Sequence, residues 1–306
     1  MTLENFCSQG WEDHATDAAG VFARLPQGVA LVTDARHIPM LAGLVVHVAG
    51  EHLGRWNEGL AILDAIERLP VFDAATPEGK ALRRSQAVLH RCAENRAEEE
   101  RCFAEGRSGG GVPEASDRIR VLAISSAALV GQKRMAEARA DFEEAVALAA
   151  YGPSKTDPAA RALAVTAHNI AVEFENRPTL TDIERKMMLH AAQVSRHFWA
   201  IAGGWMEAER GEYRLAMSHI KAGDAATALR HAQHCHRIVI ENGNDAGEAF
   251  FAHEAIARSH LAAGDAAAAR IEREVMVALV PTVADEGFRS FCAEELAKLD
   301  AELAAR

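Results

Sequence analysis

The stretch that decides the fold is residues 221–239, KAGDAATALRHAQHCHRIV. In it an apolar helix ends at AGD and a second, alanine-rich helix begins. The pattern returns at residues 261–279, LAAGDAAAARIEREVMVAL, with Gly223 and Gly264 41 residues apart. Glycine favours the left-handed conformation that ends a helix, and alanine favours the helix that follows. The two stretches therefore predict two copies of one antiparallel helix hairpin.

Two other segments carry weaker copies of this hairpin. Residues 134–150 resemble the second helix, and their small and aromatic residues follow one helical stripe: Ala138, Phe142 and Ala145. Residues 41–70 combine an apolar helix, a turn at Gly54 and a second helix that stops before Pro70. One hairpin cannot bury its own apolar face, so we expect these units to stack on one another.

These positions resemble the tetratricopeptide repeat family, which has small residues on both helices and glycine at the turn. In this chain the family positions fall on Ala216, His219, Ala228, Ala232 and Cys235 around Gly223, and on Ala257, His260, Ala269 and Pro281 around Gly264. His219 and His260 stand where the family usually has tyrosine. Residues 166–174, followed by a break at Pro178 and an N-cap at Thr181, are similar to the first helix of the longer, about 42-residue repeats typified by kinesin light chain. The resemblance implies an all-α fold, a superhelical solenoid of roughly five or six antiparallel helix hairpins.

The resemblance also implies where a partner binds, because the first helices of such repeats line the concave side of the superhelix. Carried over residue by residue, the partner-binding positions are Asn169, Tyr213, Arg214, Met217, Lys221, Phe251, Glu254 and Arg258. The amide of Asn169 can pair with both polar groups of an extended peptide, and the guanidinium groups of Arg214 and Arg258 suit a carboxylate. The alternative, that both arginines are helix-surface residues paired with acids, stays open.

One interruption divides the chain. Residues 102–118, CFAEGRSGGGVPEASDR, contain four glycines and a proline, a composition typical of a long loop. We therefore expect amino-terminal hairpins over 1–105, a glycine-rich loop over 106–117 and a carboxy-terminal repeat array over 118–306. The two arrays can also form one continuous domain.

Composition excludes several classes of partner. The 306 residues carry a formal net charge of −11, which disfavours nucleic acid and anionic membranes. The amino terminus has no signal-peptide pattern, and the longest apolar run is too short to cross a bilayer. Five widely spaced cysteines with no CxxC pair favour reduced thiols and a cytoplasmic protein. Trp199 and Trp205 are candidates for an interface in a homo-oligomer, although large aromatics near a helix junction are more often core.

A histidine-rich helix offers a different chemistry. His231, His234 and Cys235 stand at i, i+3 and i+4, which places them on one helical face where they could bind zinc or copper. The repeat register instead assigns Cys235 to a buried small position, which favours packing. No GxSxG, no phosphate-binding loop and no HExxH occurs in the sequence, so we expect no catalytic residues.

The sequence therefore predicts a non-catalytic scaffold that binds a peptide segment or a partner protein in its concave groove. One alternative is a metal-binding or metal-responsive helical protein that uses residues 231–236. A second alternative is a regulator that senses a peptide or a small molecule. The function class depends on which of these sites the tertiary structure assembles.

Overall fold

The structure, a computed structural model, describes residues 1–106 and 114–305. Helices contain 80% of the chain, and the described residues contain no strand, which confirms the predicted all-α class. The described α-helices are α1 (Leu3–Asp13), α2 (Ala18–Val29), α3 (His37–Val45), α4 (Trp56–Glu67), α5 (Pro77–Cys92), α6 (Arg96–Gly106), α7 (Glu114–Gly131), α8 (Met135–Leu148), α9 (Pro158–Glu175), α10 (Asp182–Ala202), α11 (Trp205–Ala222), α12 (Ala225–Glu241), α13 (Ala246–Ala262), α14 (Ala266–Leu279) and α15 (Glu286–Ala304). A π-helix, η1 (Val46–His52), and two 3₁₀ segments, η2 (Ala149–Tyr151) and η3 (Val280–Thr282), accompany them.

The chain forms two compact units. The amino-terminal unit contains Met1–Pro153 and Asp157–Ala162, and the carboxy-terminal unit contains Ser154–Thr156 and Leu163–Arg306. The glycine-rich loop predicted at 106–117 overlaps residues 107–113, which lie outside the described residues, and its last four residues begin α7. Helices on both sides of that segment, α5 and α7, belong to the amino-terminal unit and pack on each other.

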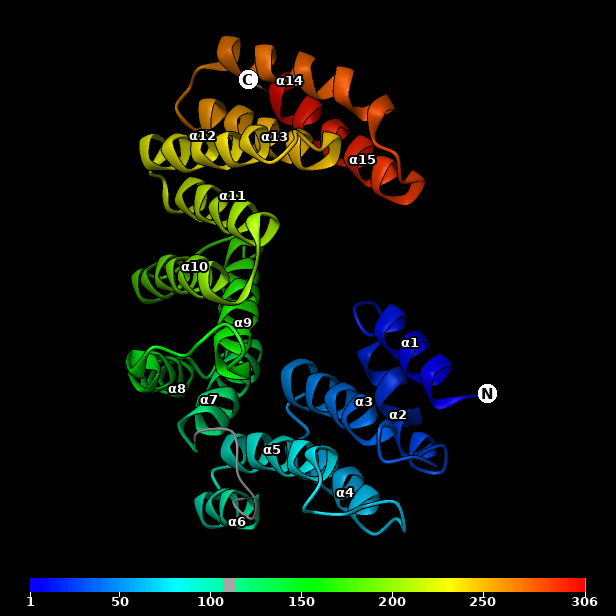
Figure 1. Cartoon of the computed structure of the whole chain (residues 1–306). Helices are drawn as coiled ribbons and strands as arrows, with labels where there is room; N and C mark the ends of the chain where they lie inside the picture. The colour runs from blue at the N-terminus through cyan, green and yellow to red at the C-terminus, as the bar shows by residue number, and fades with distance from the viewer. Residues whose placement is uncertain (107–113, 306) are drawn as a thin grey trace. The chain divides into compact units, whose positions relative to one another are not determined.

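Helices that are neighbours in sequence pack on one another in both units (Figure 1). In the amino-terminal unit α5 pairs with α6 and α7 pairs with α8. In the carboxy-terminal unit α11 pairs with α12, α13 pairs with α14, and α15 returns to pack on α13 and α14. Local pairing of this kind buries the apolar stripe of each helix against the next element along the chain.

Four of these pairs share one turn geometry. In each turn one residue adopts a left-handed conformation with φ between 60° and 84°, and these residues are Glu94, Lys133, Gly223 and Gly264. The next residue donates its backbone N–H to the carbonyl five positions earlier, with an N···O distance of 2.9 Å in every case. This is the hydrogen-bond pattern that satisfies the last carbonyl groups of a helix. The predicted equivalence of the Gly223 and Gly264 turns is confirmed.

The aspartates of the two AGD turns begin the next helix. Asp224 Oδ1 accepts the backbone N–H of Thr227 at 3.0 Å, and Asp265 Oδ1 accepts that of Ala268 at 2.9 Å. A side-chain oxygen at the N-cap satisfies one of the free N–H groups of the first turn. Thr181 forms a full capping box with Glu184 at the start of α10, as its position predicted.

The small residues of the hairpins form the core between helices, as the register predicted. Their side chains have no exposed surface: Ala138, Ala145, Ala216, Ala228, Ala232, Cys235, Ala257 and Ala269. All five cysteines of the chain are buried, and burial raises the pKa of the Cys235 thiol above its usual range. Small side chains allow the helix backbones to approach closely.

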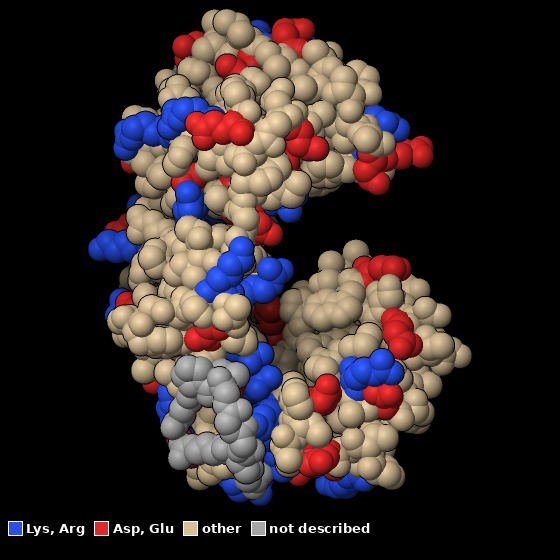
Figure 2. Space-filling model, in the orientation of Figure 1, with Lys and Arg blue, Asp and Glu red and all other residues tan. Residues whose placement is uncertain are grey.

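Many charged side chains lie at the surface, whereas a few, among them Arg91, Asp141 and Glu254, are buried. Acidic and basic side chains are interspersed on the face that Figure 2 shows. In the described part of the chain, no helix is both long and apolar enough to cross a membrane.

Candidate functional site

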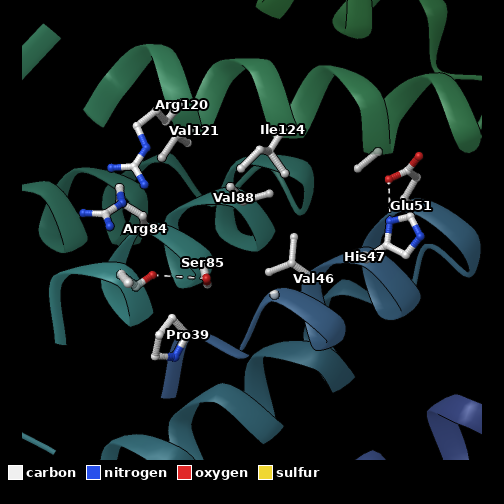
Figure 3. Close-up of a pocket in the computed structure, with 13 residues that line it drawn as sticks. Pro39, Val46, His47, Glu51, Arg84, Ser85, Val88, Arg120, Val121 and Ile124 are labelled. Atoms are coloured by element: carbon white, nitrogen blue, oxygen red, sulfur yellow. Dashed lines mark hydrogen bonds and ion pairs between the residues drawn. The ribbon is translucent and has the colours of Figure 1, made fainter. Parts of the chain in front are cut away.

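A pocket of about 260 Å³ lies within the amino-terminal unit, where α3, η1, α5 and α7 meet. Most of its wall is apolar, and the lining residues are Pro39, Gly43, Val46, His47, Glu51, Ala81, Arg84, Ser85, Val88, Arg120, Val121, Ile124 and Ala128. Figure 3 shows two arginines side by side at one end of the pocket, and His47 with Glu51 at the other end. An apolar cavity with a few polar groups at its ends is typical of a site for a small organic molecule.

At the arginine end of the pocket, two positively charged side chains share one negatively charged carboxylate. Arg84 on α5 and Arg120 on α7 each place Nη1 3.2 Å from the same oxygen, Asp117 Oδ1. The Arg84 side chain is 19% exposed. Burial, and then the neighbouring charge of Arg120, lower the pKa of Arg84 to about 10. Two guanidinium groups that share one carboxylate retain a partly desolvated positive charge, which an anion would stabilise.

The opposite end is built on the π-helix η1. Leu53 donates its backbone N–H to Val48 five residues earlier, and Arg55 donates to Ala49. Side chains satisfy two carbonyl groups of this wider helix: the indole N–H of Trp56 donates to Gly50 at 3.3 Å, and Gln132 donates to Glu51 at 2.8 Å. A π-helix is rare and is frequently found at functional sites.

The π-helix brings two histidines together beside a third, His14, which directly follows α1. His47 Nε2 and His52 Nε2 are 3.1 Å apart, and His14 lies next to both rings. One ligand atom from each of the three side chains lies within 4.8 Å of the other two. Within the described residues this is the group of histidine, cysteine and carboxylate side chains that could hold a metal ion.

Comparisons with protein-family models and with curated proteins give no match. The functional assignment therefore depends on the chemistry of the residues themselves.

The predicted cationic residues of the groove contact groups within the carboxy-terminal unit. Arg214 forms an ion pair with Glu175, which also accepts the Ser218 hydroxyl at 2.5 Å. Lys221 donates to the backbone carbonyl of Arg177. Burial raises the pKa of Glu175 above its usual range, while Arg214 and Ser218 act in the opposite direction. These contacts tie α11 to α9 and engage the positive charges that were expected to meet a partner.

A second network joins the predicted residues of α11 and α13. The Tyr213 hydroxyl donates to Glu254 at 2.9 Å, and Arg258 Nε donates to the other oxygen of Glu254 at 2.7 Å. Arg258 also forms ion pairs with Glu295 and Glu302 of α15. Glu254 is 1% exposed, so the structure brings these residues together as a buried interhelix network.

The remaining groove residues differ in exposure. Phe251 packs edge-on against Tyr213 with ring centroids 5.9 Å apart, and Met217 is half-buried. Asn169 on α9 is exposed. The amide proposed to bind a peptide backbone is therefore accessible, whereas the predicted charged residues Arg214, Glu254 and Arg258 are paired within the unit.

The predicted metal ligands on α12 contact carboxylates. His231 Nδ1 lies 2.7 Å from Glu212 Oε2, and His234 Nδ1 lies 3.2 Å from Glu212 Oε1. The Cys235 thiol donates to Glu209 Oε1 at 2.8 Å. Burial raises the pKa of Glu209 to about 8. The structure thus separates Cys235, which contacts one carboxylate of α11, from the two histidines, which contact another.

Sequence reasoning missed the pocket and its polar residues. Arg84 and Arg120 are separated by a segment read as a domain boundary, so nothing in the sequence placed them together. The usable signal was the pair His47 and His52, but their spacing of five residues places them on different faces of an α-helix. Only a π-helix makes them neighbours.

Proposed function

We propose that this protein is a non-catalytic helical binding protein whose amino-terminal unit binds a small organic anion with an apolar body. The observation that carries this proposal is the pair Arg84 and Arg120, which share the carboxylate of Asp117 at one end of an apolar pocket. The ligand's anionic group, a carboxylate or a phosphate, would lie at the arginines and its apolar part along Val88 and Ile124.

The arginine end favours an anion for two reasons. Each guanidinium group has five N–H donors in a planar fork, and one shared carboxylate engages a small part of them. Water is partly excluded at Arg84, which strengthens its interaction with an opposite charge. Hydrogen bonds to charged groups contribute about 1.5–3 kcal/mol each, enough to orient a small ligand.

The apolar wall contributes the remaining affinity. Val46, Val88, Val121 and Ile124 face the pocket between its two polar ends (Figure 3). Each Å² of apolar surface removed from water contributes roughly 25 cal/mol, so a short alkyl chain adds a few kcal/mol. A purely inorganic anion would leave this wall exposed to water.

The repeated turns support a finer proposal about architecture, a tetratricopeptide-like series of hairpins. Four turns share their backbone geometry, and two of them fall 41 residues apart at corresponding AGD sequences. A peptide-binding scaffold in the carboxy-terminal unit has weaker support than the anion pocket, because Arg214 and Arg258 are paired with carboxylates of their own unit.

The test uses three probes that share an eight-carbon chain and differ in the head group: nonanoate, octyl phosphate and octanol. Isothermal titration calorimetry should show that one or both anions bind and that octanol binds at least tenfold more weakly, because one charge-assisted hydrogen bond exceeds about 1.4 kcal/mol. Equal affinity for octanol, or no binding of either anion, would contradict the proposal.

Variants with opposite effects make this test specific. Arg84→Gln should weaken anion binding roughly 10–100-fold. Asp117→Asn should strengthen it, because the competing carboxylate is gone while the side-chain volume is kept. Arg68→Gln, which changes an exposed arginine outside the pocket, is the matched control and should bind like wild type. Weaker binding by Asp117→Asn would mean that the arginines are only structural.

A further inference from the structure

We propose that His14, His47 and His52 together bind one divalent zinc ion through their imidazole nitrogens, with water in the fourth position. This inference does not depend on the anion pocket, because the three ligands are defined by their own geometry. Three histidines with an open fourth position are a known zinc coordination set in proteins.

The distances fit a metal site. Zinc–nitrogen bonds of about 2.0–2.1 Å at tetrahedral angles place two ligand nitrogens roughly 3.3 Å apart. The Nε2 atoms of His47 and His52 are 3.1 Å apart, and the ligand atom of His14 lies within 4.8 Å of both. The ring centroids are 4.7–5.2 Å apart in all three pairs.

Two of the rings are fixed by a hydrogen-bond partner at Nδ1. His47 Nδ1 lies 2.8 Å from Glu51 Oε2, and His14 Nδ1 lies 2.6 Å from the backbone carbonyl oxygen of Trp11. Because both partners are acceptors, each Nδ1 carries the proton and each Nε2 keeps its lone pair free for a metal. A metal-bound histidine almost always donates its other N–H to a carboxylate or a backbone carbonyl.

The π-helix supplies a second, independent argument. His47 and His52 are five residues apart, and the i→i+5 hydrogen bonds of η1 bring residues at this spacing to neighbouring positions on one face. In a regular α-helix the same pair would diverge by about 140°. The departure from α-geometry coincides with the residues that it assembles, and the carbonyls it exposes are satisfied by Trp56 and Gln132.

The surroundings also suit a divalent cation. Glu51 is 32% exposed and contributes a negative charge beside His47, which partly offsets the charge of the ion. The ring of Trp11 packs on His14 and His47 at centroid distances of 5.5 Å and 4.9 Å and covers one side of the cluster. His52 is exposed, so the ion can enter from solvent.

The experiment is a metal titration of untagged, full-length protein that has been stripped with a chelator. Zn²⁺ binding is followed by calorimetry, and Co²⁺ binding by the visible absorption of its four-coordinate complexes. We expect one equivalent of metal per chain. His52→Ala changes an exposed side chain and should lower the affinity at least tenfold, and Glu51→Gln should lower it roughly 10–100-fold through the orientation of His47.

The matched control is His37→Ala, which removes a histidine of the same unit that pairs with Glu4 outside the cluster. Circular dichroism establishes that each variant keeps its helical content. Wild-type affinity in His37→Ala together with weakened binding in His52→Ala supports the site. The proposal is overturned if wild-type protein shows no Co²⁺ spectrum, or if His14→Ala/His52→Ala binds Zn²⁺ as tightly as wild type.

Discussion

Replacing Arg91 with methionine tests how strongly a buried ionic network stabilises the amino-terminal unit. Arg91 on α5 donates through Nε and Nη2 to both oxygens of Asp141 on α8, at 2.9 Å and 2.7 Å. Its Nη1 donates to Glu99 on α6 at 2.8 Å. Methionine keeps much of the side-chain volume and removes the charge. The substitution therefore isolates the ionic contribution from packing.

The size of the expected stability loss depends on which acidic residue loses its ion-pair partner. Glu99 keeps an ion pair with Arg96 at 2.9 Å, so the loss concentrates at Asp141, which keeps the Ser125 hydroxyl at 2.7 Å. The Asp141 side chain is 4% exposed. Breaking a buried pair by removing one partner costs about 3–5 kcal/mol, because the remaining charge stays buried. Because Arg96 still pairs with Glu99 and Ser125 still donates to Asp141, we expect Arg91→Met to lower the free energy of unfolding by about 3 kcal/mol, the lower end of this range.

The assay is urea unfolding followed by far-ultraviolet circular dichroism, combined with hydrogen exchange of α5, α6 and α8 because the two units can unfold separately. Arg139→Met is the control, since Arg139 and Glu143 form an exposed pair and should contribute less than about 1 kcal/mol. The double variant Arg91→Met/Asp141→Asn should recover part of the lost stability, because it removes the unpaired buried charge of Asp141. If Arg91→Met is no less stable than Arg139→Met, the reasoning is refuted.

Three more predictions concern local features. Burial raises the pKa of Glu209 to about 8, so its protonated form stabilises the fold below pH 4.5 and this contribution is lost as the pH rises toward 8. The free energy of unfolding of Glu209→Gln should therefore rise relative to that of wild type by up to roughly 1.4 kcal/mol per pH unit across this range, measured by urea unfolding. A difference between the two proteins that does not change with pH would contradict the raised pKa. Gly264→Ala, at φ +83° with no atom within 4 Å of the added carbon, should cost about 1 kcal/mol through backbone strain. Gly43→Ala inside α3 should instead stabilise by about 0.5–1 kcal/mol, and equal effects of the two alanines would refute the role of the turn. Trp56→Phe should cost about 1 kcal/mol and speed hydrogen exchange in η1, because the indole donor is lost; unchanged exchange would mean that the π-helix needs no such bond.

Part of the fold could be predicted from short stretches of sequence. The AGD turns determine both their glycine conformation and the aspartate caps that follow, because these features depend on residues within one helical turn of each other. Alanine stripes at helical spacing likewise determined which faces are buried. Thr181 and Glu184 specified the start of α10 in the same local way.

Other turns gave no such signal. Glu94 and Lys133 adopt left-handed conformations like Gly223 and Gly264 although neither is glycine. The packing of α5 with α6 and of α7 with α8 imposes this conformation against local preference, at a cost of about 1–2 kcal/mol per residue. The hairpin of α5 and α6 was therefore not predicted.

The candidate site depended on tertiary structure almost entirely. The sequence specified the helices that carry Arg84, Arg120, His14, His47 and His52, but their meeting is a property of packing between distant segments. The π-helix is decisive, because periodicity analysis assumes 3.6 residues per turn and so assigns His47 and His52 to different faces. By itself the sequence determined an all-α chain of hairpins with alanine-lined interfaces. Packing alone decided where the arginine and histidine side chains converge, because those contacts join residues whose separation along the chain follows no period.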